Sequence, residues 1–394
     1  MNRSTIIHAN LNSFEGDIVP YEIEVANGLL KNIRVHGAFE SAAADHETSA
    51  AIACPGFFDV HCHGAVGVDV NEADVDGLVK ISRYLAEQGV TAWLPTLVPD
   101  SDENYQKVID AIDELMQLQH DEEAFGQAGE PIVTGARAVG VHYEGVFANT
   151  KMCGALRPEY FKQFTGSEVS DLPRLKRGVH MTTFAPEIDG GVELAAELTR
   201  QGWIASIGHT NASVEILDAA LKAGARHVTH FFNAMSGIHH RDVGVAGWAL
   251  TNDDVTFDII ADGIHVSPQM LNFACRTKTP ERTLLISDSV APTGLGDGTF
   301  SLWGENISVI NGRTQNERGS IAGSVISMGD AVRMMLSLGF TYNELSMMAS
   351  YNPARLCGLE KERGELKVGG RADMVLLDAD GTIKRVIIAG RDVE

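Results

Sequence analysis

His61 and His63 are separated by a single residue near the end of an apolar run, PGFFDVHCHG. If this run is a β-strand, both imidazoles project to one face and Cys62 projects to the other, because side chains alternate along a strand. Two imidazoles on one face can share a metal ion. A histidine pair of this kind can also be incidental, so the metal interpretation depends on which other residues the fold places beside it.

Three further residues that could bind a metal ion end other apolar runs: Glu144 in GVHYEG, His209 in SIGHT and His230 in VTHFFNAM. Burying a carboxylate without a partner is costly, and a cation beside Glu144 removes that cost. The alternative is a glutamate exposed on the loop that follows the run. One histidine among the 14 of the chain is weak evidence, but three donors at equivalent places predict a shared metal site.

Asp288, in LLISDS, ends the last of these runs and is a candidate general acid and base. A metal ion lowers the pKa of a bound water toward neutrality, so an aspartate beside it can take the water's proton and later pass it to a departing amine. The alternative role is that of a helix N-cap on the following loop. Two other histidines are expected to be structural: His142 as a hydrogen-bonded support or core residue, and His227 because it faces away from His230 in a strand.

Eight short apolar runs must position these residues, and they alternate with helix-like segments between residues 56 and 357. That alternation is typical of parallel strands joined by crossover helices, and eight such strands close a (β/α)8 barrel of the TIM type. Catalytic groups of such barrels lie at the carboxyl ends of the strands, where the residues above fall. The expected strands cover residues 56–64, 90–98, 138–145, 178–187, 202–210, 227–235, 255–263 and 282–289.

Two of the connections between these runs have clear helical signals. Apolar residues recur at helical spacing over 75–86, and Gly89 follows where a left-handed C-terminal cap is expected. Ser213 can begin a second helix, which Gly224 ends. Both segments are predicted to be crossover helices.

The two ends of the chain differ from its middle, because YEIEV, LLKNIRV, RADMVLLD and TIKRVIIAG are short strands separated by Gly and Asp turns. We therefore expect a small β-sandwich domain built from residues 1–55 and 358–394, which brings the two ends together beside a catalytic barrel of residues 56–357. The polar stretch 119–131 is expected to be an exposed loop.

The bulk composition excludes several classes of function. The chain has 53 acidic and 31 basic residues, a formal charge of −22, and no basic tract, so binding to nucleic acid or to an anionic membrane is not expected. It has no apolar stretch of roughly 18 residues or more, and its first residues lack the layout of a signal peptide. Five scattered cysteines without a CxxC pair suit reduced thiols. We expect a cytoplasmic protein.

Six segments in this order and spacing, PGFFDVHCHG, HYEG, GHT, THFFNAM, ADGIHV and ISDS, resemble the amidohydrolase superfamily and, within it, the N-acetylglucosamine-6-phosphate deacetylases. The similarity runs over nearly the whole chain. The histidine pair with later His and Asp residues is specific only to the superfamily. THFFNAM, then Arg241, then ADGIHV is particular to the sugar-phosphate deacetylases.

The resemblance implies a metal-dependent hydrolase that converts an N-acetylhexosamine 6-phosphate to the amino sugar 6-phosphate and acetate. It implies that Glu144, His209 and His230 hold a primary divalent metal ion, and that Asp288 is the general acid and base. The histidine pair of PGFFDVHCHG would hold a second ion, so one or two ions per subunit are expected. Zinc suits this mixture of imidazole and carboxylate ligands, and iron, manganese and cobalt remain open.

The resemblance also implies that the substrate phosphate is bound by Asn233, the backbone at Ala234, Arg241 and His265. In a homodimer, Arg241 or His265 would reach in from the partner subunit. A guanidinium offers a planar, permanently charged fork for a phosphate, and in an acid-rich protein such local cations must outweigh the overall negative field. The alternative for Arg241 is a solvated loop residue.

One departure from the family pattern concerns the acyl group. The related deacetylases carry a histidine about twelve residues after the metal-binding glutamate, thought to polarise the acetyl carbonyl, and this chain has Leu156 there. Val146 likewise replaces the usual proline after Glu-Gly. Either a second metal or another group polarises the carbonyl, or the substrate is an epimer such as N-acetylgalactosamine 6-phosphate.

Two kinds of rival function remain open at this stage. The first is another amidohydrolase reaction on the same scaffold, such as that of a cyclic-amide hydrolase, an N-acyl-amino-acid deacylase or an aminohydrolase. None of these reactions would need Arg241. A non-catalytic barrel would have no use for Glu144, His209, His230 and Asp288 together, and would contain no stoichiometric metal.

Overall fold

The computed structural model describes residues 5–12, 18–35, 51–126 and 130–394. Its main body is a barrel of eight strands in which every neighbouring pair is parallel. The strands are β5 (Phe57–Cys62), β8 (Val90–Leu97), β10 (Gly140–Phe147), β11 (Val179–Phe184), β12 (Ile204–Ile207), β13 (His227–Val228), β14 (Thr256–Ile260) and β15 (Thr283–Ile286). All eight predicted strands are confirmed, and the short β9 (Arg137–Ala138) also pairs with β8.

The barrel closes between its first and last strands. The backbone N–H of Asp288 donates to the carbonyl of His61 at 2.9 Å, and Cys62 and Ser289 form a parallel bridge. Two of the candidate site residues, His61 and Asp288, therefore take part in the closure.

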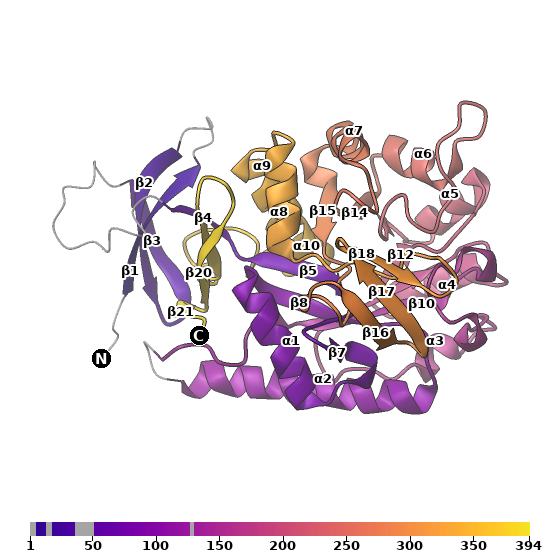
Figure 1. Ribbon diagram of the computed structural model, residues 1–394, viewed down its shortest axis with the longest axis horizontal. Coiled ribbons are helices and arrows are strands. Elements are labelled where there is room, and N and C mark those ends of the chain that lie inside the picture. Colours follow the sequence, from indigo (N-terminus) through magenta and orange to yellow (C-terminus); the bar gives the residue numbers. More distant parts are fainter. Residues whose placement is uncertain (1–4, 13–17, 36–50, 127–129) are drawn as a thin grey trace.

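Helices cover the outside of the barrel (Figure 1). The longer ones are α1 (Val75–Glu87), α2 (Asp102–Phe125), α4 (Gly191–Arg200), α5 (Val214–Lys222), α6 (Gly244–Thr251), α7 (Pro268–Lys278) and α8 (Met328–Ser337). Shorter turns are η1 (Val70–Glu72), η2 (Thr150–Met152), η3 (Pro158–Tyr160), α3 (Glu168–Asp171), η4 (Pro280–Arg282), α9 (Tyr342–Ser346), η5 (Met347–Tyr351) and α10 (Asn352–Leu356). None of the described helices is both long and apolar enough to cross a membrane.

The two predicted crossover helices are α1 and α5. Asp74 caps α1 by accepting a hydrogen bond from Gly77 N, and Gly89 follows the helix with a φ of +85°. Ser213 occupies the N-cap position of α5, and Gly224 follows that helix with a φ of +113°. A left-handed glycine ends a helix without the steric cost that a Cβ brings.

Both ends of the chain contribute to one seven-stranded sheet beside the barrel (Figure 1). Its order is β21 (Arg391–Asp392), β20 (Ile383–Ile388), β19 (Met374–Leu377), β4 (Ile52–Pro55), β1 (Thr5–Asn12), β2 (Ile18–Ala26) and β3 (Leu29–Val35). Its pairs are antiparallel except β1 with β4. The predicted β unit from both termini is confirmed as a single sheet, and β4 and β19 join its two halves. Residues 1–4, 13–17 and 36–50 of the predicted range lie outside the described residues.

Residues 119–125 are not the loop that the polarity of the stretch 119–131 predicts, because α2 continues to Phe125. Residues 127–129 of that stretch lie outside the described part of the chain. Gln119 is buried; its side chain donates to Ala136 O at 2.8 Å and accepts from Ala138 N at 2.9 Å. Glu122 and Glu123 bind Arg137. Polar side chains here have specific partners across the fold, which a hydropathy pattern cannot reveal.

A small antiparallel sheet, which the sequence reasoning missed, lies between β15 and α8. It consists of β16 (Gly298–Leu302), β17 (Glu305–Ile310) and β18 (Arg313–Asn316), and Figure 1 shows it in front of the barrel. Its inner side chains form an apolar cluster with Leu156. A two-stranded ribbon of β6 (Gly64–Ala65) and β7 (Val68–Asp69) follows β5.

Candidate active site

Six of the residues singled out from the sequence meet at one end of the barrel. Each lies in the last part of a barrel strand or within three residues of its end: His61, His63, Glu144, His209, His230 and Asp288. All six are buried. Because parallel strands all present their carboxyl ends to the same rim, residues far apart in the sequence come within hydrogen-bonding distance here.

The first half of the cluster joins the histidine pair to both carboxylates. The Nε2 atoms of His61 and His63 are 3.0 Å apart. His63 Nε2 lies 3.1 Å from Glu144 Oε2 and 3.3 Å from Asp288 Oδ1. His61 Nε2 lies 3.5 Å from an oxygen of each carboxylate.

The second half is built around the same glutamate. Oε1 of Glu144 lies 3.1 Å from His209 Nε2 and 2.9 Å from His230 Nε2. The two Nε2 atoms are themselves 3.0 Å apart. The cluster thus contains two sets of three donors that could each hold a metal ion, and they share Glu144.

The backbone is strained where three of these side chains enter the site. His209, His230 and Asp288 have φ angles of +47°, +34° and +48°, a region that residues other than glycine seldom occupy. Such conformations persist where the surrounding structure enforces them, and they concentrate at functional sites.

Two of the histidines are held in place by a hydrogen bond at Nδ1, the ring nitrogen that faces away from the cluster. His63 Nδ1 lies 3.2 Å from the carbonyl of Thr96, and His209 Nδ1 lies 2.8 Å from that of Met152. A carbonyl on Nδ1 keeps the proton there and leaves the Nε2 lone pair free for a metal ion.

The two histidines expected to be structural lie just outside this cluster. His142 Nε2 is 2.7 Å from Thr183 Oγ1, and the His142 ring packs edge-on against His61 at 4.7 Å. His227 Nε2 is 3.0 Å from Asp258, whose other oxygen accepts from the backbone N–H of His230. Both residues therefore support the site from below.

The two carboxylates and the histidines shift one another's protonation. Burial alone would raise the pKa of Glu144, but the interaction with His61 and the hydrogen bonds from His209 and His230 hold it well below its usual value. Burial would lower the pKa of His63, yet its bonds to Asp288 and Glu144 raise it to about 10. The carboxylates thus keep their negative charge and draw cations.

His230 and Asp288 follow the same pattern. Burial opposes protonation of His230, but Glu144 raises its pKa to about 9. Burial would raise the pKa of Asp288, but the interactions with His61 and His63 lower it. Asp288 is therefore ionised near neutral pH and able to accept a proton.

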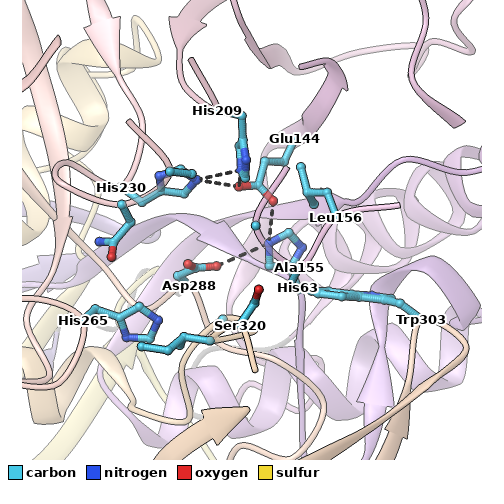
Figure 2. Close-up of a pocket in the computed structure, with 15 residues that line it drawn as sticks. His63, Glu144, Ala155, Leu156, His209, His230, His265, Asp288, Trp303 and Ser320 are labelled. Atoms are coloured by element: carbon cyan, nitrogen blue, oxygen red, sulfur yellow. Dashed lines mark hydrogen bonds and ion pairs between the residues drawn. The ribbon is translucent and has the colours of Figure 1, made fainter. Parts of the chain in front are cut away.

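The cluster opens into a cavity of about 320 Å³ (Figure 2). Its lining includes His63, Glu144, His209, His230 and Asp288. The remaining lining residues are Gly154, Ala155, Leu156, Asn233, Ala234, His265, Trp303, Ser320, Ile321 and Gly323.

Three of the four residues predicted to bind phosphate line this cavity: Asn233, Ala234 and His265. Asp262 accepts a hydrogen bond from His265 Nδ1 at 2.6 Å and holds that ring in place. The structure does not bring Arg241 to the cavity of its own chain. Arg241 is exposed, and its Nη1 lies 2.6 Å from His240 Nε2.

The sequence reasoning missed the part of the wall that follows β15. Trp303 comes from the turn between β16 and β17, and Ser320, Ile321 and Gly323 follow β18. One signal could have found this sheet, because Asn311–Gly312 is a favoured hairpin turn. Its position over the barrel end is a tertiary feature.

The known proteins with similar sequences that follow are all named as deacetylases of an N-acetylated hexosamine 6-phosphate. The chain is 32% identical over 379 residues, 96% of each chain, to an N-acetylgalactosamine-6-phosphate deacetylase of Escherichia coli O157:H7. It is 32% identical to an N-acetylglucosamine-6-phosphate deacetylase of Bacillus subtilis, covering 86% of this chain and 84% of that one. A Danio rerio relative of the latter name is 34% identical, with 90% and 88% covered.

Solved structures agree with these relatives. An N-acetylglucosamine-6-phosphate deacetylase of Thermotoga maritima superposes with a TM-score of 0.87 at 28% identity, covering 100% of this chain and 99% of that one. A mutant Mycobacterium smegmatis enzyme of the same name, in complex with N-acetyl-D-glucosamine-6-phosphate, gives 0.84 at 28% identity, with 99% and 100% covered. The model of the amidohydrolase family matches residues 52–393. From the barrel, the cluster at its rim and this match, the chain belongs to the amidohydrolase family and is a hydrolytic enzyme.

Proposed function

We propose that this enzyme hydrolyses the acetamide of an N-acetylhexosamine 6-phosphate, with N-acetylglucosamine 6-phosphate as the first candidate. One observation carries the proposal: Glu144, His209, His230 and Asp288 meet at a cavity that Asn233, Ala234 and His265 also line. The relatives named above act, by their names, on this class of compound.

Amidohydrolases are metal-dependent, and the donors of this chain fit a divalent cation. Four buried Nε2 atoms point toward one another around Glu144, with two sets of three donors. Glu144, His209 and His230 would hold one ion, and His61 and His63 with Glu144 a second. When bound, such an ion polarises an amide carbonyl and makes water a better nucleophile near neutral pH. Imidazole and carboxylate ligands suit zinc, and also iron, manganese or cobalt.

Asp288 is proposed to move the proton. Its carboxylate accepts a proton from the water that adds to the acetyl carbon, and then gives it to the amide nitrogen as the C–N bond breaks. The products are acetate and the free amine. Support comes from the lowered pKa of Asp288, which keeps it able to accept a proton, and from its lining of the cavity.

The phosphate subsite is proposed to need a second subunit. Asn233, Ala234 and His265 supply polar groups from the same chain, but none of the described residues that line the cavity is a lysine or arginine. A phosphate dianion in an acidic protein needs a compensating cation. Arg241 is exposed and so is free to reach the cavity of a partner in a homodimer.

The galacto epimer is a second candidate. The relative covered over 96% of its chain is named for N-acetylgalactosamine 6-phosphate. Leu156 also lines the cavity where the resemblance leads one to expect a histidine, and an epimeric substrate is one explanation of this difference.

A panel of substrates tests the proposal. Acetate release is measured from the 6-phosphates of N-acetylglucosamine and N-acetylgalactosamine, from the unphosphorylated sugars, and from N-acetyl amino acids, with metal content determined on the same sample. We expect turnover of at least one sugar phosphate, a kcat/KM lower by two orders of magnitude or more without the phosphate, and one or two ions per chain. Equal rates with and without phosphate would contradict the proposal.

A further inference from the structure

The cavity has two chemically different sides. In Figure 2, His230 and His265 lie on one side of Asp288, whereas Leu156 and Trp303 lie on the other, beyond His63. The first side includes His265, which can donate a hydrogen bond to a phosphate, and the second presents the apolar side chains of Leu156 and Trp303. A substrate that places its phosphate on the first side and its amide carbon at the cluster directs its acyl group toward the second.

Trp303 occupies a backbone position that does not suit it. The turn between β16 and β17 consists of Trp303 and Gly304, with φ angles of +53° and +80°. The next turn of the same sheet, Asn311–Gly312, has nearly the same angles, +51° and +75°. Asn-Gly is a favoured pair for such a turn, whereas a bulky residue with positive φ is an outlier. The turn geometry alone does not explain a tryptophan here, so its side chain must.

The side chain of Trp303 reaches the cluster. Its ring packs edge-on against His63, with centroids 5.4 Å apart and planes at 79°. Leu156 is buried and belongs to the same apolar cluster as Trp303. Gly145, next to Glu144, makes room for it, because a Cβ there would lie 2.2 Å from Leu156 Cδ1. Both apolar side chains are thus held directly beside candidate metal-binding residues.

We propose that Leu156 and Trp303 form the acyl subsite of this enzyme and restrict it to short acyl groups. This inference rests on the proposed function and identifies the part of the substrate that these two residues recognise. An apolar wall favours the acetyl methyl through burial. A longer acyl chain would have to displace Leu156 or Trp303, which their shared apolar cluster and the contact with His63 hold in place. In a closed apolar pocket, one methylene changes kcat/KM by about 10- to 200-fold.

The test compares N-acetyl, N-propionyl and N-butyryl forms of whichever amino sugar 6-phosphate the wild type hydrolyses best. Leu156→Ala and Trp303→Phe enlarge the subsite. Each should lower the ratio of kcat/KM for acetyl over butyryl by about 10-fold or more, while activity on the acetyl substrate falls less than the ratio changes. Ile310→Ala, on the same small sheet but outside the cavity wall, should leave the ratio unchanged.

Circular dichroism and thermal melting identify variants that fail to fold, and Leu156→Val then replaces Leu156→Ala as the milder change. A folded, active variant with the wild-type acyl ratio overturns the inference and leaves the proposed function intact. Wild-type inactivity on every N-acyl amino sugar phosphate overturns the proposed function itself.

Discussion

Glu144 lies where the two histidine pairs of the cluster meet, with one oxygen toward His63 and the other toward His209 and His230. A buried carboxylate surrounded by imidazoles is stable only if cations balance it. In keeping with this, Glu144 raises the pKa of His230 to about 9 against the effect of burial. The same attraction favours a divalent ion.

Asp288 allows proton transfer to be tested apart from metal binding. Asp288 belongs to neither of the two sets of three donors that could hold a metal ion. Asp288→Asn should therefore leave the metal content unchanged while lowering kcat by about 10²- to 10⁴-fold, because the amide accepts no proton. Metal analysis and acetate release on the same preparation measure both effects.

Asp254→Asn, an exposed change on the loop before β14, serves as the control and should have wild-type kcat. If the Asp288→Asn variant had near-normal turnover, Asp288 would not be the residue that transfers the proton.

At the scale of elements, the end of α2 ties the barrel to the terminal sheet. Glu123 of α2 binds Arg137 of β9 and Arg371, which precedes β19. Arg371 in turn binds Asp373 at 2.8 Å. Burial would raise the pKa of Glu123, but Arg371 and Arg137 lower it to about 2. These ion pairs also explain why a polar segment continues as a helix.

The lowered pKa of Glu123 predicts a dependence of stability on pH. The ionised form is favoured in the folded state, so its contribution is complete above the unfolded pKa of 4.5 and is lost as pH falls toward about 2. Glu123→Gln should lower the free energy of unfolding near neutral pH by roughly 2 kcal/mol. The loss should shrink as the pH falls below about 5.

Denaturant unfolding at a series of pH values measures this difference. Glu114→Gln removes an exposed carboxylate from the same helix and should change stability little. A constant difference between Glu123→Gln and wild type at all pH values would show that the charge of Glu123 is not what joins the two parts.

At the scale of the whole molecule, the chain has a net charge of −22 and is proposed to bind an anionic substrate. The described lining of its cavity contains neither lysine nor arginine, and Arg241 lies exposed on the surface. A homodimer that exchanges Arg241 between subunits would supply the missing charge, and would make each site depend on both chains.

Mixed dimers test this exchange. Arg241→Ala and Asp288→Asn chains with different tags are co-expressed, and the dimers that contain one of each are purified. If Arg241 acts across the interface, the site of the Arg241→Ala chain has its own Asp288 and the partner's arginine, so the mixed dimer should have about half of wild-type activity.

The dimer of wild type with Asp288→Asn is the control and should also retain about half. An inactive mixed dimer would assign Arg241 to the site of its own chain. The homodimer would be contradicted if no mixed dimer could be recovered and the active wild-type enzyme sedimented as a monomer.

The sequence by itself determined the barrel and most of its site. Apolar runs of strand length, each ending in a polar residue, located all eight strands, because parallel strands are buried on both faces and their carboxyl ends carry function. His61, Glu144, His209 and Asp288 could be identified because each interrupts or ends such a run. The terminal β unit followed from short strands separated by glycine and aspartate.

Only the tertiary structure decided what lies above the strand ends. The position of Trp303, the buried contacts of Leu156 and the continuation of α2 past Gln119 all depend on partners distant in sequence. Periodicity reports which side of an element is buried and not what it is buried against. Arg241 has the residue type expected of a phosphate ligand, yet the fold leaves it outside the cavity of its own chain. No local pattern reports where the fold will place a loop residue of this kind.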